Sequence, residues 1–259
     1  TYLCKRFGVV HFLIRKWYTF KLVYTGKEIR RKENIDAVFH LALEDLENAK
    51  TISSTKTDSD WLTRFFNIVE DVSDDELRRV WGKILSQEIQ LPNSYSLRTL
   101  TTISNLSKKE AELFAKIGSY IFDSKSCCFL VRSHIDVLGG VVSYEDISLL
   151  MECGLIKETH ELNLSYLSDN SSIQKYAFVY QDLAVILEVE KENLNIDIPI
   201  YELTTAGSEI YKILTIEKDM SYLQLVADNI KQPHVRIGYA KINEFTDEAI
   251  DKDDNVTYL

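Results

Sequence analysis

The clearest fold signal in this chain is the stretch from Ser73 to Ile89, SDDELRRVWGKILSQEI. Ser73 and Glu76 stand three residues apart, as in a capping box, where serine and glutamate side chains bond each other's backbone N–H groups at a helix N-terminus. Apolar side chains then recur at three- and four-residue steps, the period of one helix face. Pro92 cannot continue a helix and marks its end. We therefore expect a helix with a core face of Leu77, Val80, Trp81, Ile84, Leu85 and Ile89.

The segments on either side of this helix carry the same period. An apolar stripe predicts a helix over residues 27–52. Asp60 is placed to cap a second helix, and Ser107 with Glu110 repeats the capping-box pattern before another apolar run. Together these patterns predict a compact helical bundle over residues 27–122.

After Asp123 the helical period gives way to alternating and β-branched segments, which predict an antiparallel sheet. The order of elements resembles a winged-helix-like arrangement. The predicted fold class is therefore α+β, an N-terminal helical bundle followed by a winged-helix-like antiparallel α/β module over residues 123–246. Strands are predicted over 127–131, 140–142, 155–167, 176–180, 183–189, 194–203 and 234–242, and helices are predicted to be capped by Ser143, by Thr204 or Thr205, and by Asp219.

Charge is distributed unevenly along the chain. The net charge is −10, yet residues 1–32 hold nine Lys and Arg against the single acid Glu28. Residues 1–26 form a basic arm with interleaved aromatic side chains, and its candidate contact residues are Arg15, Lys16 and Trp17. Three settings suit this mixture: packing on the acidic body of the protein, contact of residues 1–24 with an anionic membrane, or a nucleic-acid backbone. The acidic end, residues 247–259, is expected to be a mobile tail.

Several functional classes lack their motifs. The four cysteines show no CxxC spacing and no paired histidine, so we expect reduced, mostly buried thiols and no metal site. Without a phosphate-binding loop, a nucleotide fingerprint or a nucleophile elbow, no cofactor is expected. The apolar run over residues 7–14 is too short to span a bilayer, so a cytoplasmic protein is expected, with peripheral contact at the inner membrane as the alternative. Because the chain begins at Thr1 rather than Met, an upstream segment can precede it.

Three arginines are candidates for partner contact. Arg30 and Arg31 continue the basic arm, and Arg98 follows a predicted helix start. The Arg98 guanidinium can hold a carboxylate of a partner or of the bundle itself, and the internal ion pair is favoured. The acidic cluster over residues 70–76 can imitate a divalent-metal site, but capping and the helix macrodipole already favour acids at a helix N-terminus. A structural role is therefore preferred for the cluster.

Specific DNA binding by the second half is disfavoured. Winged helices that grip DNA usually place Lys and Arg on the helix that enters the groove. The predicted helix over residues 144–152 instead carries Glu145, Asp146 and Glu152 and no basic residue.

Five blocks of sequence stand in a recognisable order: DWLTRFF at 60–66, VSDDEL at 72–77, WGKIL at 81–85, SYSLRTL at 94–100 and LSKKEAELF at 106–114. In these blocks the chain resembles the bacterial domain-of-unknown-function family 2806. The blocks LLMECGLI at 149–156 and LTTAG at 203–207 are similar to the C-terminal portion of that family. More distantly, the pattern resembles the abortive-infection alpha family, whose members are associated with phage defence.

The distant resemblance implies a role in antiviral immunity and establishes no chemistry. We expect a non-enzymatic sensor or adaptor of a bacterial antiphage system, acting through contacts with a phage-encoded or operon-encoded protein. One alternative is a toxic effector that associates with a membrane through the basic arm. The other is a hydrolase or nuclease with an unfamiliar site. Self-association into a homo-oligomer is left open.

Overall fold

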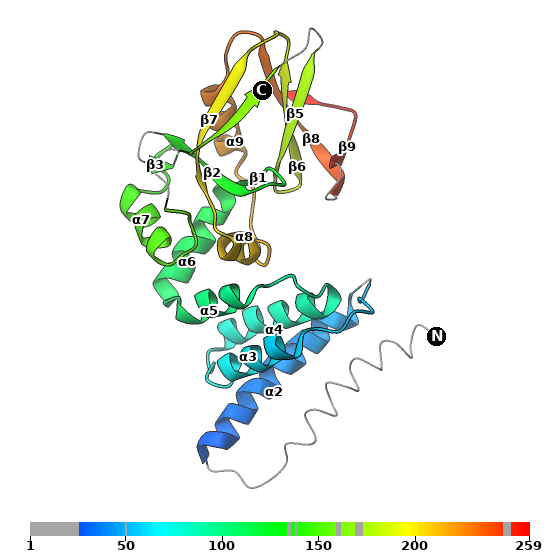
Figure 1. The fold of residues 1–259 in the computed structure, drawn as a ribbon, viewed down its shortest axis with the longest axis vertical. Coiled ribbons are helices and arrows are strands. Elements are labelled where there is room, and N and C mark those ends of the chain that lie inside the picture. Colours follow the sequence, from blue (N-terminus) through cyan, green and yellow to red (C-terminus); the bar gives the residue numbers. More distant parts are fainter. Residues whose placement is uncertain are drawn as a thin grey trace. The chain divides into compact units, whose positions relative to one another are not determined.

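The computed structural model describes residues 26–49, 51–133, 136–137, 139–158, 162–168, 173–245 and 250–259. The chain forms two compact units, Thr1–Ser104 and Asn105–Leu259. The first is helical and the second is built on a sheet, which confirms a mixed α+β protein with a helical N-terminal part (Figure 1). Nearly all of the predicted basic arm lies outside the described residues.

Four helices make the described part of the first unit: α2 (Gly26–Glu47), α3 (Ser59–Val69), α4 (Asp75–Gln90) and α5 (Leu97–Asn105). Their core is aromatic. The Phe65 ring stacks on Trp61 with centroids 5.1 Å apart and meets the Trp81 ring edge-on at 5.6 Å. Such aromatic pairs add to the stabilisation from area burial. Among the described residues of both units, every helix is either too short or too polar to cross a membrane.

Helices α2 and α4 lie side by side and make the closest helix pair of this unit. A Cβ atom on Gly82 would lie 2.8 Å from the Leu41 Cβ and 3.3 Å from the Ala42 backbone nitrogen. Glycine is therefore what lets the two backbones approach. Polar bonds hold the pair on both sides of this crossing, from Arg78 to Asn34 at 2.6 Å and from Ser86 to Asp45 at 3.3 Å.

The helix ends differ from the predicted ones by a few residues. Asp58 rather than Asp60 caps α3, and α2 ends at Glu47. Asp74 caps α4, because its carboxylate accepts the N–H groups of Glu76 and Leu77 and so replaces the predicted Ser73.

The predicted core face of α4 is wrong at its N-terminal end. Leu77 and Val80 are 45% and 36% exposed, whereas Trp81, Ile84, Leu85 and Ile89 are buried as expected. The first turns of α4 are attached to α2 and to the α3–α4 connection through the Arg78 guanidinium, which bonds Asn34 and the Val72 carbonyl. The side of the helix that carries Leu77 and Val80 therefore stays open to solvent.

The second unit begins with α6, which follows the predicted Ser107–Glu110 capping box and which the sequence analysis grouped with the bundle. One curled antiparallel sheet follows, with the strand order β10-β8-β6-β5-β1-β2-β7-β4, β3 beside β2 and β9 beside β8 (Figure 1). The elements in chain order are α6 (Lys108–Ile117), a 3-10 turn (Gly118–Tyr120), β1 (Ile121–Asp123), β2 (Cys128–Ser133), β3 (Asp136–Val137), α7 (Tyr144–Glu152), β4 (Leu162–Leu167), β5 (Gln174–Tyr180), β6 (Leu183–Val189), β7 (Asn195–Glu202), α8 (Thr205–Tyr211), α9 (Met220–Ile230), β8 (Val235–Phe245), β9 (Ile250–Lys252) and β10 (Thr257–Tyr258).

The core of this unit is a second aromatic cluster between the sheet and α9. The Phe122 ring lies 5.6 Å from Phe129, 5.4 Å from Phe178 and 6.0 Å from Tyr222 of α9, measured between centroids. The buried Tyr180 hydroxyl bonds the backbone of Ser119 and of Asp219, the cap of α9. Every residue of β6 is buried, so this strand lies at the centre of the core.

Most predicted elements of this half are confirmed, with two corrections. Residues 140–142 form no strand, because Gly139 and Gly140 take positive φ angles of 88° and 65° and turn the chain ahead of α7. Of the strand predicted over 155–167, only 162–167 is regular, apart from a single bridge between Ile156 and Leu203.

The predicted mobile tail is wrong for the residues described there. Strands β9 and β10 both pair with β8. Gly238 makes room for this pairing, since a Cβ atom there would lie 2.8 Å from the Thr257 carbonyl oxygen. The Tyr258 hydroxyl donates to the Glu188 carboxylate at 2.8 Å, and the Arg236 guanidinium lies over the Tyr258 ring at 4.0 Å. The C-terminal segment is too polar for its sequence to predict a strand. Contacts of Tyr258 with Glu188 and Arg236 hold it on the sheet.

The pKa of Glu188 predicts how this cluster responds to acid. Glu188 is 4% exposed and receives the Lys175 Nζ at 2.6 Å. Burial raises its pKa, but the hydrogen bonds from Lys175 and Tyr258 outweigh burial, and the pKa lies below its usual value. A carboxyl with a pKa lower in the folded than in the unfolded state contributes stability above the unfolded pKa of about 4.3 and loses it as pH falls through the folded pKa.

We therefore expect Glu188→Gln to speed amide hydrogen exchange in β8 and β10 at pH 6–7, and the difference from wild type to shrink below about pH 4. Exchange measured by mass spectrometry across this range is the test. Glu192→Gln, which changes an exposed carboxylate in the β6–β7 connection, is the matched control. Equal exchange in the Glu188 variant and wild type at neutral pH would contradict the assignment.

Candidate functional site

The connection between α4 and α5 is an irregular loop built around one buried carboxylate. Glu88, near the end of α4, is only 1% exposed. Its two oxygens accept the backbone N–H of Asn93 at 2.7 Å and of Tyr95 at 3.0 Å. One side chain thus satisfies two backbone N–H groups, so Glu88 fixes the path of the chain across the turn.

Further contacts hold the same loop from other elements. The Trp61 indole N–H of α3 donates to the Tyr95 carbonyl at 2.7 Å, and the Tyr95 hydroxyl donates to the Gln87 side chain. At the start of α5, the Ser96 hydroxyl accepts the Thr99 N–H at 3.2 Å. Asn93 takes a positive φ of 72°, which asparagine tolerates better than most residues. The loop is therefore a preformed surface of the first unit.

This loop presents apolar and cationic side chains to solvent. Leu91 at its start is 68% exposed, more than any other large apolar residue described, and Leu97 at its end is also exposed. Arg98 follows and is exposed. Within the described part of the chain, no carboxylate lies within ion-pair distance of Arg98, so the favoured internal ion pair is not formed there. We refer to residues 91–98, which are this connection and the first two residues of α5, as the Leu91 loop.

The other predicted contact residues fall elsewhere. Arg15, Lys16 and Trp17 lie outside the described residues. Arg30 is exposed on the first turns of α2. Arg31, by contrast, forms a two-pronged bond to the Asp71 carboxylate, at 3.0 and 3.1 Å, and an ion pair with Glu70 at 3.1 Å. The structure thus uses Arg31 to join α2 to the end of α3.

The acidic cluster belongs to the same internal network. The buried Asn34 side chain donates to the Glu70 carbonyl at 2.8 Å and accepts from Arg78. Arg78 also pairs with Asp75 at 2.7 Å, while Asp74 caps α4. The structural role preferred for these acids is therefore what their described contacts show. The described residues contain no group of three His, Cys, Asp or Glu side chains placed to hold a metal ion.

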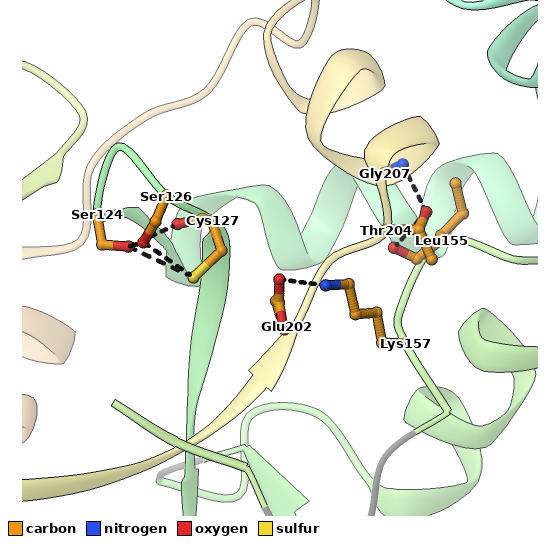
Figure 2. A network of polar contacts seen from close by, with 8 residues as sticks. All are labelled: Ser124, Ser126, Cys127, Leu155, Lys157, Glu202, Thr204 and Gly207. Atoms are coloured by element: carbon orange, nitrogen blue, oxygen red, sulfur yellow. Dashed lines mark hydrogen bonds and ion pairs between the residues drawn. The ribbon is translucent and has the colours of Figure 1, made fainter. Parts of the chain in front are cut away.

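In the second unit the blocks LLMECGLI and LTTAG meet as one clasp. The Thr204 hydroxyl donates to the Gly154 carbonyl at 2.6 Å and accepts the Gly207 N–H at 3.0 Å, which caps α8. A Cβ atom on Gly207 would lie 2.1 Å from the Leu155 carbonyl oxygen. An ion pair between Lys157 and Glu202 closes the same junction (Figure 2). These residues hold α7 and α8 together and explain why the motif needs a hydroxyl and a glycine.

Two thiols of this unit, Cys128 and Cys153, are unsuited to nucleophilic chemistry at neutral pH. Burial raises the pKa of Cys128 to about 12. Burial and the neighbouring Glu110 raise the pKa of Cys153 to about 11. Both thiols stay protonated, and only a thiolate is a good nucleophile. Cys127 lies beside Ser124 and Ser126 in the β1–β2 turn (Figure 2), with the Ser124 hydroxyl 3.4 Å from its sulfur. All three described cysteines are free, but only Cys128 is buried, so the prediction of mostly buried thiols is wrong for Cys127 and Cys153.

Sequence patterns indicated Arg98 as a contact residue but not Leu91 or Glu88. The position of Leu91 directly before the helix-ending Pro92 is a usable signal, because such a residue lies past the last helical turn. Nothing in the sequence marks Glu88 as buried. Its hydrogen-bond donors are backbone N–H groups five and seven residues further on, and no side-chain pattern reports them.

Replacing Glu88 by Gln tests the assignment of the loop. Glutamine offers one acceptor oxygen, so one of the two N–H groups loses its partner, at a cost of about 1–3 kcal/mol. We expect faster hydrogen exchange at Asn93 and Tyr95, with the amides of α2 and α3 unchanged. NMR exchange rates give the answer, and Glu44→Gln, on an exposed position of α2, serves as the control. Unchanged rates at both loop amides would show that Glu88 does not order the loop.

Comparison with known proteins places the chain in a family. A family model described as a protein of unknown function, DUF2806, matches residues 24–227. No curated protein and no solved structure matches the chain. The matched range includes the Leu91 loop and both blocks of the clasp in the second unit. The resemblance to family 2806 is thereby confirmed over most of the chain, the one to the abortive-infection alpha family is not shown, and the protein belongs to the family DUF2806.

Proposed function

We propose that this protein is a non-enzymatic sensor or adaptor that acts through protein–protein contacts, and that the Leu91 loop is one of its contact surfaces. The observation that carries the proposal is the exposure of Leu91, on a loop held by the buried Glu88 carboxylate, and of Arg98, in the first turn of α5 directly after that loop. Binding surfaces are often loops positioned by a rigid scaffold.

The energetics of the loop support binding. Burying a leucine side chain fully is worth about 1.5–3 kcal/mol. Arginine is among the residues enriched at energetically dominant interface positions. Since Glu88, Trp61 and Tyr95 already order the loop, a partner need not supply the free energy of ordering it. The partner that fits presents an apolar pocket for Leu91 beside a carboxylate for Arg98.

The proposed setting is bacterial antiphage defence, of the abortive-infection type. It rests on the distant resemblance of the sequence to the abortive-infection alpha family. On this proposal the second unit is a winged-helix-like module that meets protein rather than DNA. Glu145, Asp146 and Glu152 on α7, with no Lys or Arg on that helix, support the choice.

Introducing negative charge at Leu91 or at Arg98 is the direct test. The tagged full chain would be purified from its native bacterial host, with nuclease treatment, before and during phage infection, and co-purifying proteins identified by mass spectrometry. We expect a stoichiometric phage or host protein that is reduced at least tenfold by Leu91→Asp and by Arg98→Glu. Arg64→Glu, which alters an exposed arginine on α3, should retain it.

Two outcomes would count against the proposal. A partner retained equally by all three variants would place the contact surface elsewhere. Recovery of the chain alone under both conditions would turn attention to lipids and to an activity of the chain itself.

A second candidate is a toxic effector that associates with an anionic membrane through the basic arm. Lys27 and Arg30 at the start of α2 are exposed, and the apolar Ile29 between them is also exposed. The start of α2 therefore exposes basic and apolar side chains, the same combination that Arg15, Lys16 and Trp17 provide in the arm. Basic side chains and apolar groups at one surface suit an anionic bilayer.

Liposome flotation separates this candidate from the adaptor. With vesicles rich in phosphatidylserine, the full chain should float at low salt, and deletion of residues 1–24 should abolish flotation. Arg30→Glu should weaken it, whereas Arg98→Glu should not. Flotation that survives the deletion would show that the arm is not the membrane contact.

A further inference from the structure

Strand β4 ends the sheet, and its backbone shows which edge is open. It pairs with β7 in continuous register from Leu162 opposite Ile200 to Leu167 opposite Asn195. Just past the strand, the Ser168 N–H donates to the Leu194 carbonyl at 3.0 Å, and the Ser168 carbonyl accepts the Asn193 N–H at 2.7 Å. Ser168 thus directs both of its backbone groups toward the β7 side.

Alternate residues of a strand direct their backbone groups to opposite edges. The even-numbered residues of β4 therefore face β7, and Asn163, Ser165 and Leu167 face outward. The Leu167 carbonyl confirms this direction, since it accepts the Tyr176 hydroxyl of β5 at 2.6 Å rather than a β7 group. In the part of the chain that the structure describes, the outward N–H and C=O groups of Asn163 and Ser165 have no backbone partner.

The Tyr176 side chain of β5 covers this edge at Leu167 and packs on Tyr166, with ring centroids 4.9 Å apart, but the edge at Asn163 and Ser165 lacks the usual protection by sequence. Edge strands are commonly guarded by charged side chains, proline, a bulge or a very short length. The six residues of β4, LNLSYL, include no charge and no proline, and their register with β7 shows no bulge. The other end of the sheet is different, because the two-residue β10 and the three-residue β9 pair with β8 there.

We propose that β4 is a self-pairing edge, on which the β4 strand of a second copy of this chain adds antiparallel to continue the sheet. With a two-fold axis through Leu164, Asn163 lies opposite Ser165 of the second copy, and Leu164 lies opposite its own equivalent. The outward backbone groups of Asn163 and Ser165 then form four hydrogen bonds across the axis, in the alternating pattern of an antiparallel ladder.

The side chains of β4 favour a second copy over an unrelated strand. In this register half-buried Leu162 meets Tyr166 of the second copy, so apolar groups share one face of the sheet. Exposed Asn163 and Ser165 meet on the other face. Because β4 carries no charge, no like charges come opposite one another, although the chain as a whole is acidic.

Cysteine cross-linking tests the register in the full chain. Facing residues of a non-hydrogen-bonded antiparallel pair have Cα atoms about 4.5 Å apart, which suits a disulfide. Leu164→Cys should therefore give a covalent dimer under mild oxidation. Ser165→Cys is the matched control, because its two copies are offset by two residues, beyond the limit of about 7 Å for a disulfide. Wild type sets the background from native thiols.

Sedimentation gives a second, independent readout. Asn163→Pro removes an outward N–H and no bond to β7, so it should raise the dimer dissociation constant roughly tenfold or more. Asn163→Ala keeps the N–H and should dimerise as wild type does. If the proline variant loses its circular dichroism, Asn163→Lys, an edge-blocking charge, replaces it.

The proposal predicts a wild-type dimer, a Leu164-specific cross-link and loss of the dimer in the proline or lysine variant. A wild-type monomer at all concentrations, equal cross-linking at both cysteine positions, or a dimer unaffected by both edge variants would overturn it. So would capture of a different protein's strand by monomeric chain. None of these outcomes depends on the Leu91 loop.

Discussion

A carboxylate withdrawn from water must find hydrogen-bond donors, and this constraint organises the irregular parts of both units. Among the described residues, each unit contains one nearly buried glutamate, Glu88 in the first and Glu188 in the second. Glu88 gathers two backbone N–H groups and so shapes the turn between α4 and α5. Glu188 gathers a lysine and a tyrosine hydroxyl and so holds the last strand on the sheet. An unpaired charge in either place would be strongly destabilising.

The same rule decides which surface charges are available to partners. Arg31 and Arg78 bond the acids and the backbone around the α3–α4 connection, with the buried Asn34 side chain between them. These arginines stabilise the helical unit. Arg98 has no such partner among the described residues and stands beside exposed leucines. A positive charge contributes to recognition only when the fold has not already neutralised it, and that distinguishes Arg98 from Arg31.

The two ends of the sheet show a parallel contrast. At β8 the chain's own last strands cover the edge, and Gly238 has no side chain that would obstruct them. At β4 the outward backbone groups of Asn163 and Ser165 have no backbone partner among the described residues, and the strand carries no charge to repel another strand. If both proposals hold, the Leu91 loop on one unit and the β4 edge on the other are two separate contact surfaces, as an adaptor requires.

The sequence by itself determined the helical first part, the capping box at Ser107, the helix cap at Ser143, the strands β5 to β7 and the family. These features depend on neighbours within a few residues, which periodicity and capping chemistry report. Tertiary structure alone decided that Leu77 is exposed, that Glu88 is buried, that Arg31 is paired and that the acidic end forms strands. Most of these depend on a group far along the chain, as in the separation of 40 positions between Arg31 and Asp71 or of 70 between Glu188 and Tyr258. Glu88 is the exception, because its partners lie five and seven residues further on, in an irregular turn that helical periodicity does not report. Local patterns carry no record of such distant partners, because the partner's position is set by how whole helices and strands pack.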